Sequence, residues 1–210
     1  MSLFKSIFSP ITRGSASLFL LGAICVNFAV LQVNARVSGD EEDRRNARVQ
    51  ASYITRLVKC IRWEENSTER QKNFKIVVVG EETAGLVNSL SFLVEQTNLS
   101  NETHFIEVFH FPNSKSEEAI DFITAGTNFV YFTQDSILTV KDVTPYKKGA
   151  LLLSQGREFI ELDRGCIAFE KKKNRIKLIM NVRCFDRRIS RVNPVLTSLK
   201  SVVEVVNPYL

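Results

Sequence analysis

Apolar residues along the chain follow two different spacings. Short continuous runs rich in Val, Ile and Phe are typical of strands buried on both faces of a parallel sheet, whereas apolar residues three and four positions apart predict amphipathic helices. The runs lie at 74–80, 104–111, 129–133 and 150–154; helical spacing occurs at 49–63, 86–94 and 114–124, with a partial helix at 134–148 that Pro145 breaks. This order predicts a three-layer α/β sandwich, in which helices cover both faces of a mostly parallel sheet of about four strands.

The last third of the chain has a different pattern. Residues 166–172 and 175–181 alternate between apolar and polar positions and are joined by Lys173 and Asn174, which predicts an antiparallel hairpin. In its two-residue register Ile167 and Phe169 face Met180 and Leu178. Two short helical pieces are expected after the hairpin, one before Pro194 and one after it.

The centres of the apolar runs define the expected core. A strand that is buried on both faces leaves no position for water, so these side chains should pack against helices above and below the sheet. The residues expected to be buried are Ile76, Val77, Val78, Val130, Phe132, Leu151 and Leu153.

The first 35 residues have the composition of an export signal. Lys5 and Arg13 precede an apolar run at 17–31, and Val33-Asn34-Ala35 provides a cleavage site, so the mature chain is expected to begin near Arg36. An uncleaved signal anchor is the alternative. We interpret the chain as a signal peptide at 1–35, a polar leader at 36–47 that runs into a helix, and one α/β domain at 48–206, in the periplasm or secreted.

Composition limits the classes of partner. Apolar residues make up 44% of the chain, which indicates a globular protein. Loss of Lys5 and Arg13 with the signal lowers the basic residues from 28 to 26 against 23 acidic ones. This small net positive charge does not indicate DNA or RNA as a partner.

The mature chain holds three cysteines, Cys60, Cys166 and Cys184. In an oxidising compartment one disulfide and one free thiol is the simplest arrangement. A Cys166–Cys184 bond requires the chain to turn back directly after the hairpin, and Cys60 is then expected to be a buried thiol. The absence of a CxxC pair argues against a zinc site, and we expect no cofactor.

No set of residues predicts catalysis. Gly80 and Gly85 have the spacing of the start of a phosphate-binding loop, but Leu86 and Val87 stand where the loop needs Lys and Ser or Thr, so a structural role is favoured. His104 and His110 would lie roughly 20 Å apart on one strand, too far to share a metal or a proton. The sequence therefore predicts a protein that is not an enzyme.

Basic residues gather near the C-terminus. Arg183, Arg187 and Arg191 recur every four residues, with Arg188 beside them, and would form one stripe if the segment were helical. A solvated face is the simplest interpretation. The alternatives are a surface for an acidic partner protein or for anionic lipid headgroups.

Taken in order, several segments resemble the YfiR-like family of small bacterial periplasmic proteins. They are 51–54, 61–63, 74–80, 151–154, the loop from Gly156 to Gly165, and 175–181. The resemblance covers about residues 48–206, although Ile179 and Met180 stand where the family usually has Glu and Ile. The best-known member of that family is a redox-sensitive dimer that binds and represses a membrane-bound diguanylate cyclase from the periplasmic side, and the resemblance implies a partner of this kind for the present chain; its cysteines do not match that member's disulfide pattern.

Two functions from different classes follow. The first is a non-catalytic periplasmic regulator that restrains an inner-membrane signalling enzyme, a diguanylate cyclase or a sensor kinase. Its contact surfaces would be the basic cluster of Arg183, Arg187, Arg188 and Arg191 and the hydrophobic first helix, one for the membrane partner and one for a homodimer. The alternative is a small-ligand-binding module whose cleft lies at the carboxyl ends of the strands, near Gly80 and Gln134. An enzyme with an unrecognised site is a third and weaker hypothesis.

Overall fold

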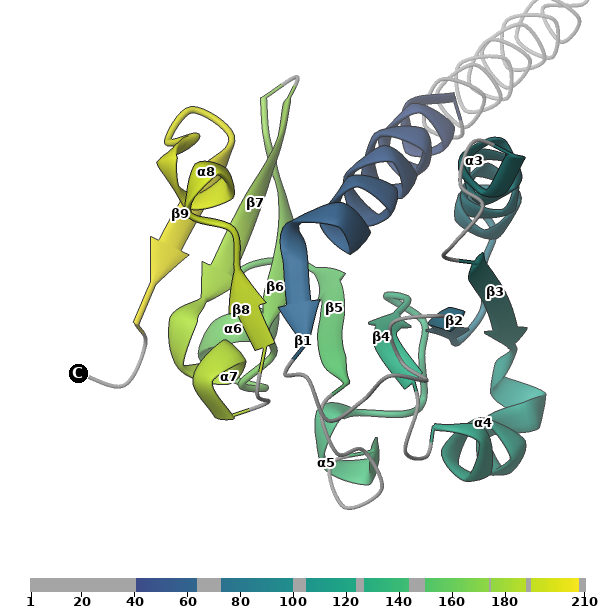
Figure 1. Cartoon of the computed structure of the whole chain (residues 1–210). Helices are drawn as coiled ribbons and strands as arrows, with labels where there is room; N and C mark the ends of the chain where they lie inside the picture. The colour runs from purple at the N-terminus through teal and green to yellow at the C-terminus, as the bar shows by residue number, and fades with distance from the viewer. Residues whose placement is uncertain are drawn as a thin grey trace, which may run out of the picture. The chain divides into compact units, whose positions relative to one another are not determined.

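The computed structural model describes residues 41–63, 73–99, 105–123, 127–143, 150–173, 175–187 and 190–207. The chain divides into two compact units, Met1–Glu42 and Asp43–Leu210, and the description below concerns the second. The expected signal peptide and the first part of the leader lie outside the described residues. Residues 41–47, the end of that leader, are helical and belong to a helix that ends at residue 60, called here the N-terminal helix (Figure 1).

A seven-stranded sheet forms the centre of the second unit, in the order β3-β2-β4-β5-β6-β7-β9. The first five of these strands are parallel, β7 is antiparallel to β6, and β9 is parallel to β7. The strands are β2 (Asn73–Val79), β3 (Phe105–Phe111), β4 (Thr127–Phe132), β5 (Leu151–Gln155), β6 (Ile167–Lys172), β7 (Arg175–Asn181) and β9 (Val203–Val206). A separate two-stranded antiparallel ribbon pairs β1 (Ile61–Trp63) with β8 (Ser190–Val192).

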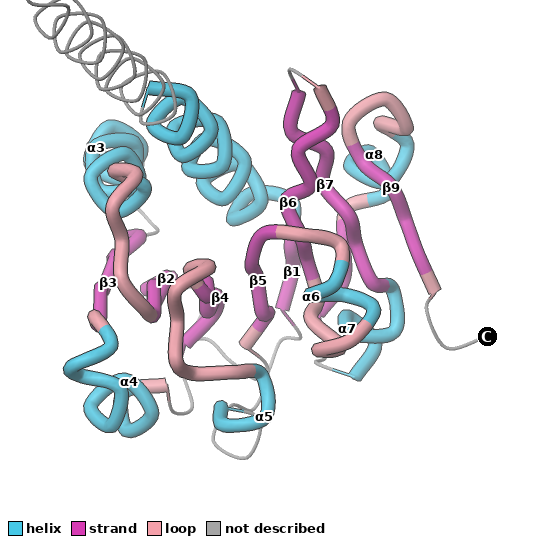
Figure 2. Tube along the Cα trace, turned by 180° about the vertical axis from the view of Figure 1, so that it is seen from behind, coloured by secondary structure: helices cyan, strands magenta, loops and turns pink. Residues whose placement is uncertain are grey.

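The sheet is larger than the four strands expected from the sequence. The predicted hairpin forms, with Ile167 opposite Met180 and Phe169 opposite Leu178, but its first strand also pairs with β5 and extends the sheet. The two helical pieces expected around Pro194 form as α7 (Val182–Arg187) and α8 (Pro194–Ser198). The second is shorter than expected, and residues 203–206 form a strand, because Val203 packs into the core and the segment is rich in β-branched Val. Figure 2 shows this last strand beside the hairpin, at the end of the sheet away from β3.

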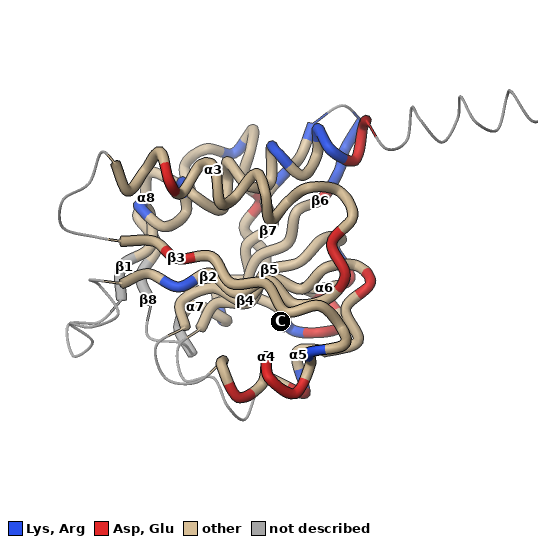
Figure 3. Tube along the Cα trace, turned by 90° about the vertical axis from the view of Figure 1, so that its right-hand side faces the viewer, with Lys and Arg blue, Asp and Glu red and all other residues tan. Residues whose placement is uncertain are grey.

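Helices cover both faces of the sheet, as the alternating pattern predicts. The N-terminal helix and α3 (Leu86–Leu99) lie on one face, and α4 (Ser116–Phe122) and α5 (Val140–Val143) lie on the other (Figure 3). The chain passes from β2 to β3 at the edge of the sheet and then returns past β2 to β4. Because both crossovers are right-handed but run in opposite directions along the sheet, their helices, α3 and α4, lie on opposite faces. The remaining short helices are η1 (Asn113–Lys115), α6 (Glu158–Glu161), α7 (Val182–Arg187) and α8 (Pro194–Ser198).

The expected core is confirmed. Each of the seven predicted core residues is buried, and Val78 has no exposed surface. All six residues of β4 are buried, which explains why its sequence is apolar at successive positions rather than alternating.

The partial helix predicted at 134–148 is mostly wrong: only Val140–Val143 is helical, and 144–149 lie outside the described residues. The side chain of Asn113 holds the segment before α5 in a turn. Its amide donates to the carbonyl of Asp135 at 2.8 Å, and its oxygen accepts from the amide of Ile137 at 3.0 Å. The first of these bonds occupies the Asp135 carbonyl, which a helix over this segment would have paired internally.

An ion-pair network joins α6, β6, β7 and β9. The guanidinium of Arg157 lies 3.1 Å from Glu170 and 2.8 Å from Glu204, and the Lys177 amine lies 2.9 Å from Glu204. Hydrogen bonds from Lys177 and Arg157 lower the pKa of Glu204 from its ordinary 4.5 to about 2. The network therefore attaches the last strand to the rest of the sheet by charge as well as by backbone hydrogen bonds.

We predict that Val78→Asp unfolds the second unit or nearly so. An unpaired carboxylate in this position costs several kcal/mol, comparable with the ~5–15 kcal/mol that stabilises a typical domain. Circular dichroism during thermal melting is the measurement. Phe105→Asp is the matched control, because Phe105 also lies in a strand but is 53% exposed. A Val78→Asp protein that melts like the wild type would show that the buried strand is wrongly assigned.

We also predict an acid-dependent contribution from Glu204. The folded state lowers its pKa, so the unfolded state binds the proton more readily and the stabilisation is present above about pH 4.5. It is lost as the pH falls toward about 2. The difference in unfolding free energy between wild type and Glu204→Gln should shrink over this range, as measured by urea titration at each pH. Glu95→Gln, the same change at an exposed position of α3, is the matched control.

Candidate functional site

A cleft of about 460 Å³ lies at the carboxyl ends of the parallel strands. The connection after β2 leads toward β3, whereas the connection after β4 leads toward β5, so the two loops diverge. Such a switch point is where open α/β sheets usually bind ligands. The cleft is lined by Asp43, Asn46, Ala47, Gln50, Glu81, Glu82, Thr83, Ala84, Leu86, Tyr131, Thr133, Gln134, Asp135, Gln155, Gly156, Arg157, Glu158, Phe169, Glu170, Lys171 and Ile176.

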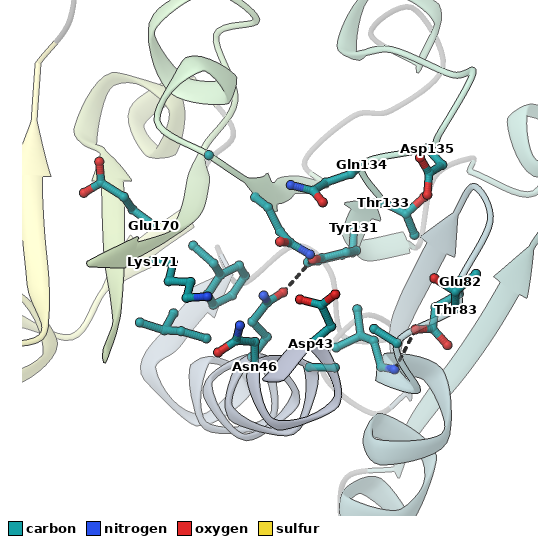
Figure 4. Close-up of a pocket in the computed structure, with 18 of the residues that line it drawn as sticks. Asp43, Asn46, Glu82, Thr83, Tyr131, Thr133, Gln134, Asp135, Glu170 and Lys171 are labelled. Carbon is teal, nitrogen blue, oxygen red and sulfur yellow. Dashed lines mark hydrogen bonds between the residues drawn. The ribbon is translucent and has the colours of Figure 1, made fainter. Parts of the chain in front are cut away.

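The floor of the cleft is a buried polar pair (Figure 4). The Tyr131 hydroxyl donates a 2.6 Å hydrogen bond to the Gln50 side-chain oxygen. Tyr131 is 1% exposed and Gln50 is 3% exposed. Burial raises the pKa of the Tyr131 phenol well above its ordinary value, although a hydrogen bond from Gln155 opposes the shift. Tyr131 is therefore a neutral donor that connects β4 to the N-terminal helix.

Glu82 and Gly80 shape the wall of the cleft that the β2–α3 loop forms. The Glu82 carboxylate accepts from the amide of Leu86 at 2.8 Å, at the start of α3, where negative charge is favourable. Gly80 has a φ of +105°, and a Cβ there would clash with Thr133 and Ser136. The glycine therefore has the structural role expected from the sequence, as a strand end packed closely against the loop after β4.

His110 does not line the cleft. The His110 ring Nε2 donates to the carbonyl of Gly80 at 2.9 Å and so joins β3 to the end of β2. His104 lies outside the described residues. No group of three or more His, Cys, Asp or Glu side chains in the described part of the chain is arranged to hold a metal ion.

The charges around the cleft are unequal. Six carboxylates line it, against the two cations Arg157 and Lys171. Arg157 already lies against Glu170 and Glu204, and hydrogen bonds with these carboxylates raise the pKa of its guanidinium. The positive charge of Arg157 is thus compensated, and the cleft keeps an excess of negative charge.

The basic cluster does not form a single helical stripe. Helix α7 ends at Arg187, and Arg191 follows in β8, where it pairs with Arg62 across the ribbon. Arg183 is half-buried on α7, and Arg188 lies outside the described residues. The change of secondary structure removes the four-residue spacing on which the stripe depended.

A disulfide joins Cys166 to Cys184, with Cα atoms 5.1 Å apart. Both residues are buried, and the bond forms because α7 begins directly after β7 and turns the chain back over the start of β6. The third cysteine, Cys60, has a free thiol that is half-buried, not buried as expected. Its position at the end of the N-terminal helix explains the difference.

A family model, described as YfiR/HmsC-like, matches residues 47–199. The chain belongs to the YfiR/HmsC-like family. The match begins within the N-terminal helix and extends through α8, so it includes most of the cleft and both disulfide cysteines. No curated protein matches the chain. Within the described residues of this YfiR/HmsC-like protein, no helix is long and apolar enough to cross a membrane.

Part of the site was not predicted from the sequence. The sequence places Asp43 and Asn46 in a polar leader, but both lie in the N-terminal helix and line the cleft. The sequence pattern does not distinguish Gln50 either, although it lies three residues before Tyr53 on the predicted helix and is buried. A polar residue on the apolar face of a helix was the available signal.

We predict that removing the disulfide by the double change Cys166→Ala/Cys184→Ala lowers the unfolding free energy by about 2–4 kcal/mol. The bond closes a loop over a sequence separation of 18 residues, and its loss frees the unfolded chain. Urea unfolding measures the change. Cys60→Ala should have a smaller effect, and a reducing agent should bring the wild type to the level of the double variant. Equal stability with and without reductant would contradict the prediction.

Proposed function

We propose that the chain is an exported, periplasmic, non-catalytic regulator that binds and restrains an inner-membrane signalling enzyme such as a diguanylate cyclase. The YfiR/HmsC-like match over residues 47–199 carries this proposal, because that family is regulatory rather than catalytic. The export signal expected at 1–35 supports the compartment.

The two surfaces expected to contact partners, the N-terminal helix and the basic cluster, differ in how much of each is available for binding. The apolar stripe of the N-terminal helix is used by the core, since Ala51, Ile54 and Leu57 are buried. Among the apolar residues of this helix only Val49 is exposed, at 38%. The basic cluster of Arg183, Arg187, Arg188 and Arg191 is therefore our proposed surface for the membrane partner. Self-association as a homodimer remains part of the proposal without an assigned surface.

Ligand binding is the second candidate function, and the cleft at the switch point favours it. Its volume falls within the range of small-molecule sites, and its position matches the one expected from the ends of β2 and β4. The two functions are compatible, since a regulator needs an input signal.

We predict that deleting the gene raises cellular cyclic di-GMP and that the wild-type gene restores it. Arg187→Glu/Arg191→Glu should restore it poorly, because reversed charge slows association with an acidic surface, most strongly at low salt. The matched control is Arg56→Glu/Lys59→Glu, which places the same charge change at exposed positions of the N-terminal helix. Pull-down from membranes should recover the signalling enzyme with wild type and control. Unchanged cyclic di-GMP on deletion, with no membrane signalling protein recovered, would overturn the regulatory proposal.

A further inference from the structure

The cleft combines a polar floor with an acidic wall. Small-molecule sites are usually lined mainly by apolar side chains with a few polar groups. This cleft has the opposite balance, with carboxylates, amides and hydroxyls contributed by the N-terminal helix and by the loops after β2, β4 and β5. Such a lining suits a hydrophilic ligand.

Three of the six carboxylates that line the cleft contribute charge that no described side chain offsets. Asp43, Asp135 and Glu158 have neither an ion pair nor a side-chain hydrogen bond with any residue that the structure describes. In Figure 4 the Asp43 carboxylate points from the N-terminal helix toward the cavity beside Tyr131. Uncompensated charge of one sign in a concave site attracts the opposite charge and repels phosphates and other anions. The charge therefore favours an ammonium group.

Gln50 supplies an independent indication of a ligand. Its side-chain oxygen is occupied by Tyr131, whereas its amide nitrogen has no hydrogen-bond partner among the described residues. The residue is 3% exposed and lines the cleft. This nitrogen is not among the buried side-chain atoms that lack a partner, so it is open to solvent in the cleft, and a ligand hydroxyl, which both donates and accepts, can bond to it there.

We propose that the cleft binds a small hydroxylated amine, an amino sugar or an amino alcohol. The ammonium group pairs with Asp43 and its neighbouring carboxylates, and a hydroxyl bonds to the Gln50 amide. Asp43, Asn46 and Gln50 lie on one face of the N-terminal helix, so a bound ligand joins this helix to the loops at the strand ends. This inference deepens the ligand-binding candidate and rests on it, but it does not depend on the identity of the membrane partner.

The test is isothermal titration calorimetry of the purified mature protein with three matched sugars. Glucosamine carries the ammonium group, glucose replaces it with a hydroxyl, and glucuronate carries a negative charge instead. We expect glucosamine to bind, glucose to bind about two- to fivefold more weakly, and glucuronate to give no measurable binding. Putrescine, which has amines but no hydroxyl, should bind more weakly than glucosamine.

Two variants test the assignment of residues. Asp43→Asn should reduce the preference for glucosamine over glucose, because it removes a charge from an exposed helix position without altering the core. Asp121→Asn, at an exposed position of α4 outside the cleft, is the matched control and should leave the preference unchanged. Thermal melting verifies that both variants are folded.

Several results would overturn the inference. Equal binding of glucosamine and glucose, tighter binding of glucuronate, or an unaltered preference in Asp43→Asn would show that the cleft does not select an amine. No binding of any of the four compounds would also reject it. Because the titration uses the isolated protein, these outcomes are distinct from the failure of the regulatory proposal, which the gene deletion decides.

Discussion

The need to cover both faces of three adjacent strands, β2, β4 and β5, determines the rest of the fold. Nearly every side chain of these strands is buried, so the sheet requires helices above and below it. Right-handed crossovers can place helices on both faces only if the chain reverses its direction along the sheet. That reversal separates the loops after β2 and β4 and opens the cleft between them. The position of the site is thus a consequence of how the core is buried.

The sequence predicts what depends on local pattern. The β-branched run around Val78 identified a central strand, and the alternation on both sides of Lys173 identified the hairpin with its correct register. It did not predict that β6 would join β5, because that pairing depends on how one strand meets another far along the chain. The helix predicted at 134–148 was wrong for the same reason. The conformation of this segment is decided by the side chain of Asn113, which lies 22 residues from Asp135.

The site was predictable in position and not in composition. Gly80 and Gln134 marked the strand ends where a cleft was expected, and the cleft lies there. The floor was not predictable, because the Tyr131–Gln50 bond joins residues 81 positions apart. The helical structure around Asp43 was not predictable either. Its neighbours in sequence are charged and show no helical spacing of apolar residues, so local pattern alone predicts a polar leader. The ion pairs of Glu204 likewise depend on a strand that local propensity did not separate from a helix.

The cleft draws its lining from segments far apart along the chain, from Asp43 to Ile176. A chain that appears in sequence order has no such cleft until β6 and the start of β7 are present and the N-terminal helix has packed beside them. The cleft therefore exists only once the segments between Asp43 and Ile176 have packed together. Partly folded chains lack one wall or the floor, so a compound that recognises the complete cleft would distinguish the folded protein from them.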